Sequence, residues 1–177
     1  MRRVVLVRHA EPLVADGTPP SQWPLTEQGR DDATVLGRRL ADGSATTTVW
    51  TSPERKTCET AALAFPSAPT RVREQLSEVK RAWYATPDDL AQAAASYLRG
   101  EVVGGWERRD DVIARLAPLQ ADVTPGARLV VVSHGMLLTT WLDHELGLED
   151  PMSFWSNLQM PDAWELDLEE KSLQRIT

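Results

Sequence analysis

Two of the three histidines in this chain follow apolar runs that are typical of buried strands. The stretch VVLVRHAEP, residues 4–12, leads from aliphatic side chains directly into Arg8 and His9. The stretch LVVVSHGMLL, residues 129–138, leads in the same way into His134. An arginine presents several N–H donors to an anion, and a neutral imidazole is a nucleophile. These residue types predict a site that binds an anion such as a phosphoryl group and attacks it.

A third polar segment, TSPERKTCETA at residues 51–61, also follows a predicted strand and carries a cation at Arg55 or Lys56. Each of the three strands precedes a helix, whose first N–H groups are free and whose N-terminus carries partial positive charge. A phosphoryl group has three equatorial oxygens to neutralise, so several fixed donors suit it. The three segments therefore predict an anion pocket with His9 at its centre.

The elements that must position these residues alternate between strands and helices. Strands are predicted at 3–8, 46–52, 70–74 and 127–134, with a terminal pair at 162–168 and 172–177. Helices are predicted at 25–42, 52–65, 86–100, 104–123 and 135–147. Capping residues favour three of these starts: Thr26, Ser52 followed by Pro53, and Thr86 followed by Pro87. The alternation predicts a mostly parallel sheet with helices on both faces, where ligands bind beyond the carboxyl ends of the strands.

The composition is that of an ordinary globular domain. The chain has 177 residues, of which 42% are hydrophobic, and a net charge of −7. This length predicts a single domain over residues 1–177, with a short cap or lid at about 77–106, where strand character is lost. The negative charge argues against a nucleic-acid or membrane-surface partner, and no apolar run is long enough for a transmembrane helix. We therefore expect a cytoplasmic protein.

Cysteine and tryptophan add two further expectations. The single cysteine, Cys58, leaves no internal disulfide and no cysteine-rich zinc site. Three tryptophans, Trp23, Trp83 and Trp106, lie in polar, loop-like surroundings. They either line a pocket or cover the edges of the core.

Five ordered segments of the chain resemble the histidine phosphatase superfamily, which has the phosphoglycerate-mutase-like fold. They are LVRHAEP, WPLTEQGRDDA, TSPERKTCETA, QLSEV and VVSHGMLL, and the resemblance covers essentially the whole chain. The resemblance implies a three-layer α/β/α domain and a phosphohistidine intermediate. It also implies four side chains that contact the phosphoryl group and a carboxylic acid that protonates the leaving group.

The resemblance also implies roles for individual residues. Arg8 and His9 match the signature pair of the family, which makes His9 the nucleophile. His134 matches the second family histidine, which hydrogen-bonds the phosphoryl oxygens. Glu78, in LSEVKRAW, matches the position of the acid and base. Three other glutamates are alternatives for that last role: Glu74, Glu101 and Glu107.

This chain departs from the family pattern at three positions. Ala10 replaces the glycine that usually follows the Arg-His pair, and Pro12 replaces a small polar residue. The third departure concerns the second cation of the pocket. Counting four residues forward from the serine of the Ser-Pro pair, or four back from the threonine of the Thr-Ala pair, gives Lys56 where the family has arginine. Arg55 is the alternative if the alignment shifts by one residue.

The resulting hypothesis is a metal-independent phosphatase that hydrolyses phosphate monoesters. His9 attacks phosphorus while Arg8, Lys56, His134 and helix N–H groups hold the equatorial oxygens. Glu78 protonates the leaving oxygen and then activates water. No cofactor or metal ion is expected, and the partner is a small phosphorylated substrate.

Three other functions fit the same motifs. A phosphoglycerate-type mutase would need a lid that excludes water, and only about thirty residues, 77–106, are available for one. A protein phosphohistidine phosphatase would suit a small, open site. An inactive phosphoryl-binding module is the alternative from a different class.

Overall fold

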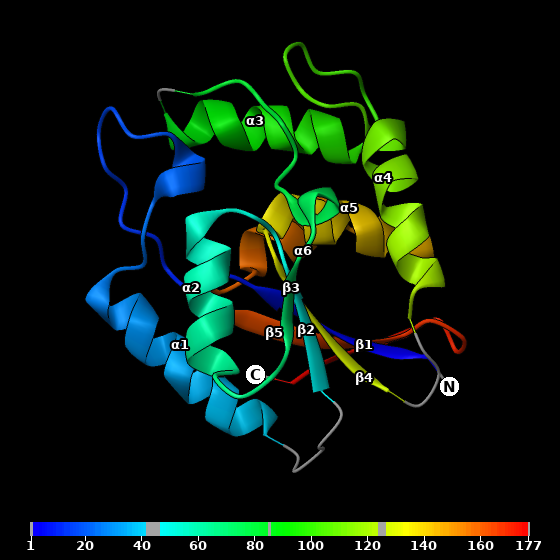
Figure 1. Cartoon of the computed structure of the whole chain (residues 1–177). Helices are drawn as coiled ribbons and strands as arrows, with labels where there is room; N and C mark the ends of the chain where they lie inside the picture. The colour runs from blue at the N-terminus through cyan, green and yellow to red at the C-terminus, as the bar shows by residue number, and fades with distance from the viewer. Residues whose placement is uncertain (1, 42–46, 85, 124–126, 177) are drawn as a thin grey trace.

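The computed structural model describes residues 2–41, 47–84, 86–123 and 127–176. Within these ranges six strands form one sheet in the order β3-β2-β4-β1-β5-β6 (Figure 1). Strands β3, β2, β4 and β1 run parallel to one another, whereas β5 is antiparallel to β1 and β6 to β5. The strands are β1 (Arg3–Arg8), β2 (Thr47–Thr51), β3 (Thr70–Val72), β4 (Arg128–Ser133), β5 (Asp162–Asp167) and β6 (Ser172–Arg175).

Helices cover both faces of this sheet, as predicted. The described α-helices are α1 (Glu27–Leu40), α2 (Arg55–Ala64), α3 (Pro87–Leu98), α4 (Arg109–Ala121), α5 (Gly135–Leu146) and α6 (Pro151–Asn157). Successive side chains of a strand point to opposite faces. Val5 and Val7 of β1 therefore pack with α1 and α2, while Val4 and Leu6 pack with α3, α4 and α5. The result is a three-layer α/β/α domain, with α1 and α2 on one face and α3 to α6 on the other (Figure 1).

The register of the parallel strands brings the predicted site segments together. Arg8, at the end of β1, pairs with Ser133 at the end of β4, and Thr51 of β2 pairs with Val132 of β4. The backbone N–H of His9 continues this pairing, since it donates to the carbonyl of Ser133 at 3.0 Å. The three strand ends thus lie side by side at one edge of the sheet.

Most predicted elements lie where they are expected. Thr26 begins α1 by accepting from the N–H of Gly29 at 2.9 Å, and Thr86 begins α3 by accepting from the N–H of Asp89 at 3.1 Å. The terminal strand pair is present as the antiparallel hairpin of β5 and β6. The predicted element ends at residues 42, 46 and 177 lie outside the described residues.

The predicted start of α2 is wrong. Ser52 and Pro53 precede the helix, which begins at Arg55 with Glu54 as its N-cap residue. The Ser52 hydroxyl accepts from the N–H of Glu54 at 3.2 Å, and it also lies 2.7 Å from the Thr57 hydroxyl and 2.8 Å from the ring of His134.

Two further differences concern helix boundaries and short helices. α4 starts at Arg109 rather than at residue 104, because Gly105 has a φ of 78° and belongs to a turn. The seven-residue helix α6 and the 3₁₀ turns Pro20–Gln22 and Glu74–Leu76 were not predicted, since elements this short show no clear helical period. None of the described helices combines the length and apolar character needed to cross a bilayer.

Candidate active site

A cleft of about 750 Å³ opens at the edge of the sheet where β1, β2 and β4 end. The five predicted site residues all line it: Arg8, His9, Lys56, Glu78 and His134. Four rival residues, each within the described part of the chain, do not line it: Arg55, Glu74, Glu101 and Glu107. The fold therefore gathers side chains that lie far apart in the sequence around one cavity.

The imidazole of His9 is held as a neutral ring. Its Nδ1 lies 2.8 Å from the carbonyl oxygen of Ala10. Because a carbonyl only accepts, Nδ1 carries the proton and Nε2 keeps its lone pair. Burial is the main cause that holds the pKa of His9 well below its usual value, and His134 and Lys56 act in the same direction. A neutral imidazole with a free Nε2 is the form that acts as a nucleophile.

The substitution at Ala10 fits this loop. Ala10 is buried against Leu25 and Ala33, and its backbone N–H donates to the hydroxyl of Thr60 at 3.0 Å. Ala10 does not have a positive φ, so a residue with a Cβ causes no backbone strain here. The main chain beside His9 is thus fixed by a contact to α2.

His134 lies against His9, with ring centroids 5.3 Å apart. Its Nε2 is 2.8 Å from the hydroxyl of Ser52 and 3.2 Å from Oε1 of Glu54. Its Nδ1 is buried and has no hydrogen-bond partner among the described residues. Burial is the main cause that lowers the pKa of His134, and the charge of Lys56 adds to it. The ring therefore adds hydrogen-bonding capacity to the site without adding a charge.

Arg8 is anchored from the far end of the chain. Its Nη1 donates to the carbonyl of Leu158 at 2.6 Å, while its Nε is buried without a partner among the described residues. A Cβ at Gly135 would approach this Nε to 3.2 Å and the Trp155 indole nitrogen to 3.4 Å. Glycine at this position lets the guanidinium lie against the start of α5, with a donor still free for an anion.

The two candidate cations of α2 point in different directions. The side chain of Lys56 is 7% exposed and lies in the cleft, where its ammonium donates to the carbonyl of Pro20 at 2.8 Å. The side chain of Arg55 is 57% exposed and forms an ion pair with Glu59 at 2.8 Å. Successive side chains on a helix point about 100° apart, so only one of the two can face the cleft. The structure places Lys56 there.

Glu78 covers the N-terminus of α5. Its Oε1 accepts from the N–H groups of Val79 and Leu137, each at 2.9 Å, and its Oε2 accepts from Met136 at 3.3 Å. Burial raises the pKa of Glu78, and the nearby carboxylate of Glu54 also raises it, while the two N–H donors on Oε1 oppose the shift. A carboxyl with a raised pKa in a cleft that is also lined by Arg8 and Lys56 is suited to general acid catalysis.

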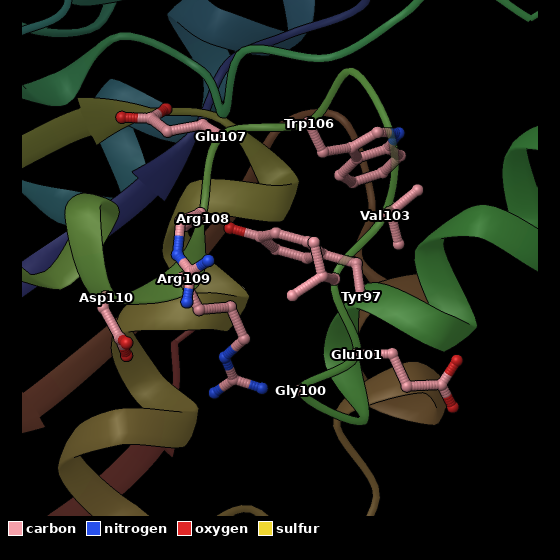
Figure 2. A pocket seen from close by; sticks show the side chains of 10 residues that line it. Tyr97, Gly100, Glu101, Val103, Trp106, Glu107, Arg108, Arg109 and Asp110 are labelled. Carbon is pink, nitrogen blue, oxygen red and sulfur yellow. The ribbon is translucent and has the colours of Figure 1, made fainter.

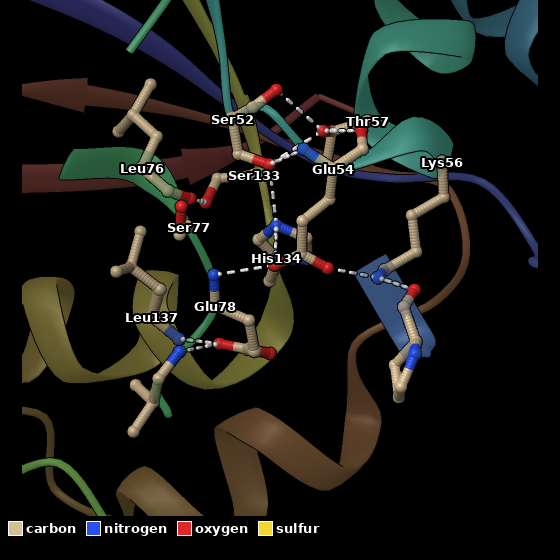
Figure 3. A network of polar contacts seen from close by, with 12 residues as sticks. Ser52, Glu54, Lys56, Thr57, Leu76, Ser77, Glu78, Ser133, His134 and Leu137 are labelled. Carbon is tan, nitrogen blue, oxygen red and sulfur yellow. Dashed lines mark hydrogen bonds and ion pairs between the residues drawn. The ribbon is translucent and has the colours of Figure 1, made fainter. Parts of the chain in front are cut away.

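Glu54 is a functional candidate that the sequence reasoning missed. Figure 3 shows its carboxylate between His134, Lys56 and the backbone of Glu78. Oε1 accepts from the N–H of Glu78 at 3.0 Å, and Oε2 forms an ion pair with Lys56. An acidic residue near a helix start is ordinary, so nothing in the local sequence distinguishes Glu54. Its position becomes visible only when three segments come together.

The outer wall of the cleft is largely aromatic and apolar. Trp23 and Trp83 both line it, with their rings edge to face at a centroid distance of 6.0 Å. Trp155 and Met160 line the cleft as well. Of the three tryptophans singled out in the sequence, two are therefore pocket residues, and the third, Trp106, is not.

Trp106 instead belongs to the apolar core of the segment predicted as a lid. Its indole N–H donates to the Tyr84 hydroxyl at 2.7 Å, and its ring packs on Tyr97 at 4.9 Å. Beside these rings lies a second cavity of about 60 Å³ (Figure 2). Arg109, on its edge, already donates to Asp143 at 2.6 Å and to the carbonyl of Leu98. This small cavity is a packing feature between α3 and α4.

Comparisons with known proteins agree with this geometry. Residues 4–171 match the family model of the histidine phosphatase superfamily (branch 1). No match is found among the curated proteins. Three solved structures illustrate the likeness of fold. A mycobacterial glucosyl-3-phosphoglycerate phosphatase shares 23% identity, with 98% of this chain and 96% of that chain covered and a TM-score of 0.71.

The other two structures extend the range of organisms. YhfR of Bacillus stearothermophilus shares 25% identity, with 98% of this chain and 94% of that chain covered and a TM-score of 0.70. A phosphoserine phosphatase variant from Entamoeba histolytica, in complex with phosphoserine, shares 16% identity, with 100% and 96% covered and a TM-score of 0.74. These likenesses extend over the whole three-layer domain.

Proposed function

This chain belongs to branch 1 of the histidine phosphatase superfamily, and from that premise we propose that it hydrolyses phosphate monoesters through a phosphohistidine at His9. One observation carries the proposal. The His9 imidazole is buried and neutral with a free Nε2, in the same cleft as Arg8, whose Nε lacks a partner among the described residues. That pairing suits attack on an anionic phosphoryl group.

The first step forms the phosphoenzyme. The lone pair of His9 Nε2 attacks phosphorus in line, and the bond between phosphorus and the ester oxygen breaks. Glu78, in its protonated form, gives its proton to that oxygen, so the leaving group departs as an alcohol. Arg8, Lys56 and His134 hold the equatorial oxygens of the phosphoryl group, where charge is spread in the transition state.

The second step restores the enzyme. The Glu78 carboxylate takes a proton from a water molecule as the water oxygen attacks phosphorus. The bond between phosphorus and His9 breaks, its electron pair returns to Nε2, and inorganic phosphate leaves. The cleft is wide and its rim residue Trp83 is 71% exposed, so water can enter. This openness favours a phosphatase over a mutase, which must protect the intermediate.

The glucosyl-3-phosphoglycerate phosphatase and the phosphoserine phosphatase that share the fold support a phosphatase reaction in this chain. Side-chain cations supply the charge neutralisation in the mechanism above, so we expect it to run without a metal ion. Prolonged treatment with a chelator should leave the rate of ester hydrolysis unchanged. A loss of rate that a divalent ion restores would require a different mechanism.

The covalent intermediate is the decisive test. Brief reaction with a ³²P-labelled ester should give a phosphoenzyme that is labile in acid and stable in base, and His9→Ala should abolish both the label and turnover. His144→Ala, which removes an exposed imidazole outside the cleft, is the matched control. Turnover that persists in His9→Ala would remove the central claim. Binding of phosphate without any turnover by the unmodified protein would identify a binding module instead.

A further inference from the structure

Glu54 is a largely buried acid inside the proposed anion site, and the mechanism above does not use it. Its side chain is 12% exposed. Both carboxylate oxygens contact groups that an anion pocket would offer to its ligand. Oε1 lies 3.2 Å from Nε2 of His134, and Oε2 pairs with the ammonium of Lys56 (Figure 3). In the free protein these two donors are already engaged by a negative charge.

The charges around Glu54 leave the cleft short of positive charge. Lys56 is compensated by Glu54, and the pKa of His134 is held low by burial, so His134 is neutral. Arg115, which also acts on His134, is compensated by Glu107 at 2.8 Å. The other cations that line the cleft are Arg8, Lys80 and Arg81.

A phosphate ester brings two negative charges into this environment near neutral pH. Two carboxyl groups, those of Glu54 and Glu78, line the cleft that this ligand would enter, and the N–H of Glu78 donates to Oε1 of Glu54 at 3.0 Å. Like charges at such distances favour the protonated form of a carboxylic acid. We place the proton on Glu78, because burial raises the pKa of Glu78, while the Glu54 carboxylate forms an ion pair with Lys56.

We propose that Glu54 is a positioning residue that makes the site bind a phosphoryl dianion together with a proton, which resides on Glu78. The inference rests on the phosphatase function proposed above and deepens it. The proton that enters with the dianion is the one that the first chemical step passes to the leaving oxygen. Glu54 therefore couples binding of the phosphoryl dianion to protonation of Glu78, the acid of the first step.

Glu54 also positions the groups it touches. Its Oε1 lies 3.2 Å from Nε2 of His134, and this contact fixes the orientation of that ring. The N–H of Glu78 donates to Oε1 of Glu54 at 3.0 Å, which fixes the backbone that carries the acid. These contacts hold the acid and the second histidine in one arrangement before a ligand arrives.

Sulfate is a suitable probe, because it resembles a phosphoryl dianion and takes up no proton itself near neutral pH. Calorimetric titration of the full chain with sulfate at pH 8, in buffers of different ionisation enthalpy, gives the number of protons bound per sulfate. The unmodified protein should take up about one proton. Glu54→Gln should take up markedly fewer and should bind sulfate about tenfold more tightly, the equivalent of one pKa unit.

Three further variants complete the test. Glu54→Asp keeps the charge and should retain proton uptake, and Glu54→Met supplies a second neutral side chain of similar length if the Gln variant does not fold. Glu59→Gln makes the same chemical change in the same helix, where the carboxylate pairs with Arg55 and Arg30 and does not line the cleft. Its proton uptake and sulfate affinity should equal those of the unmodified protein.

A purely structural role for Glu54 would not move the pH profile. If Glu54 keeps Glu78 protonated, the alkaline limb of kcat/KM should shift in Glu54→Gln to lower pH by about one unit. Sulfate binding without proton uptake by the unmodified protein, or equal uptake by Glu54→Gln, would overturn the inference while leaving the phosphatase proposal intact. Absence of both ester hydrolysis and anion binding would instead count against the proposed function.

Discussion

Lys56 is the residue at which this site differs most from the pattern that its family suggests. An ammonium is a compact point charge, whereas a guanidinium offers a planar fork that can bind two oxygens at once. In this structure the ammonium is held between the carbonyl of Pro20 and the carboxylate of Glu54. These two contacts fix the position of the charge, which a flexible lysine stem alone would not do.

Variants of the two adjacent cations test this placement. Lys56→Ala should lower kcat/KM by about 10² to 10³, the usual loss for a donor that stabilises transition-state charge. Arg55→Ala, the matched control, should have a mild effect because its side chain is exposed. Lys56→Arg should retain partial activity. Steady-state assays of the three variants on one ester give kcat/KM for each. A large loss of kcat/KM in Arg55→Ala together with a near-normal value in Lys56→Ala would assign the phosphate-binding cation to Arg55 instead.

Glu78 gives a second prediction at the scale of residues. Glu78→Gln cannot donate a proton to the leaving oxygen, so alkyl esters, which leave poorly as alkoxides, should slow far more than nitrophenyl esters. The comparison of kcat/KM for the two ester classes checks this. Glu101→Gln is the control, since that exposed carboxylate pairs with Arg99 and does not line the cleft. Equal slowing of both classes in Glu78→Gln would place the acid at another residue.

The sequence predicted the residues that stand at strand ends, because a strand fixes where its last side chains go. Arg8, His9 and His134 could be placed in one cleft for that reason. Lys56 could be chosen over Arg55 from spacing alone, since each step along a helix turns the direction of the side chain by about 100°. Glu54 could not be predicted, because its contacts depend on how the ends of three separate segments meet.

Among the elements, the start of α2 shows what local rules leave out. A serine followed by a proline is a common helix start, and it predicted Pro53 as the first helical residue of α2, two residues too early. The Ser52 hydroxyl accepts from the N–H of Glu54, and it also makes a tertiary contact with Nε2 of His134 at a different strand end. The helix begins at Arg55, and Glu54, which has an extended backbone, lines the cleft.

Two connecting segments, 12–23 and 77–84, form the aromatic outer wall and give a prediction for the leaving group. Paired aromatic rings favour an apolar group over a small charged one. We expect kcat/KM for 2-phenylethyl phosphate to exceed that for phosphoserine, and Trp83→Ala to lower the former about 2- to 10-fold. Val102→Ala, an exposed apolar change outside the cleft, should alter neither. A preference for phosphoserine that survives Trp83→Ala would contradict this reading of the wall.

At the scale of the whole molecule, the buried histidines make stability depend on pH. The lowered pKa of His9 and of His134 means that the unfolded chain binds more protons than the folded one below about pH 6.5. The folded state therefore has the full stabilisation from its neutral histidines above that pH, and the free energy of unfolding decreases as the pH drops. Each histidine contributes about 1.4 kcal/mol per pH unit in this window.

The raised pKa of Glu78 changes stability with pH in the opposite direction. Its raised pKa means that the folded state holds the extra proton between the usual value for a glutamate and the raised one, and this contribution is lost as the pH rises through that window. Two histidines outweigh one glutamate where the windows overlap. Urea unfolding between pH 5 and 8 measures the net slope, which in His9→Gln should fall by about 1.4 kcal/mol per pH unit below about pH 6 and stay unchanged above about pH 7. His144→Gln, an exposed change, should keep the slope of the unmodified protein, and an unchanged slope in His9→Gln would contradict a neutral, buried His9.

The place of β1 in the sheet has a consequence for how this protein is made. β1 lies between β4 and β5, both of which follow it by most of the length of the chain, and Arg8 is tied to Leu158, 150 residues later. During translation His9 leaves the ribosome long before the strands that will flank it, so its strand waits unpaired, and pairing at this sequence separation is slow. A chain that stalls or is truncated before Leu158 carries His9 without the contact that holds Arg8 beside it. We therefore expect the arrangement of the cleft to form only after residue 158 has been synthesised.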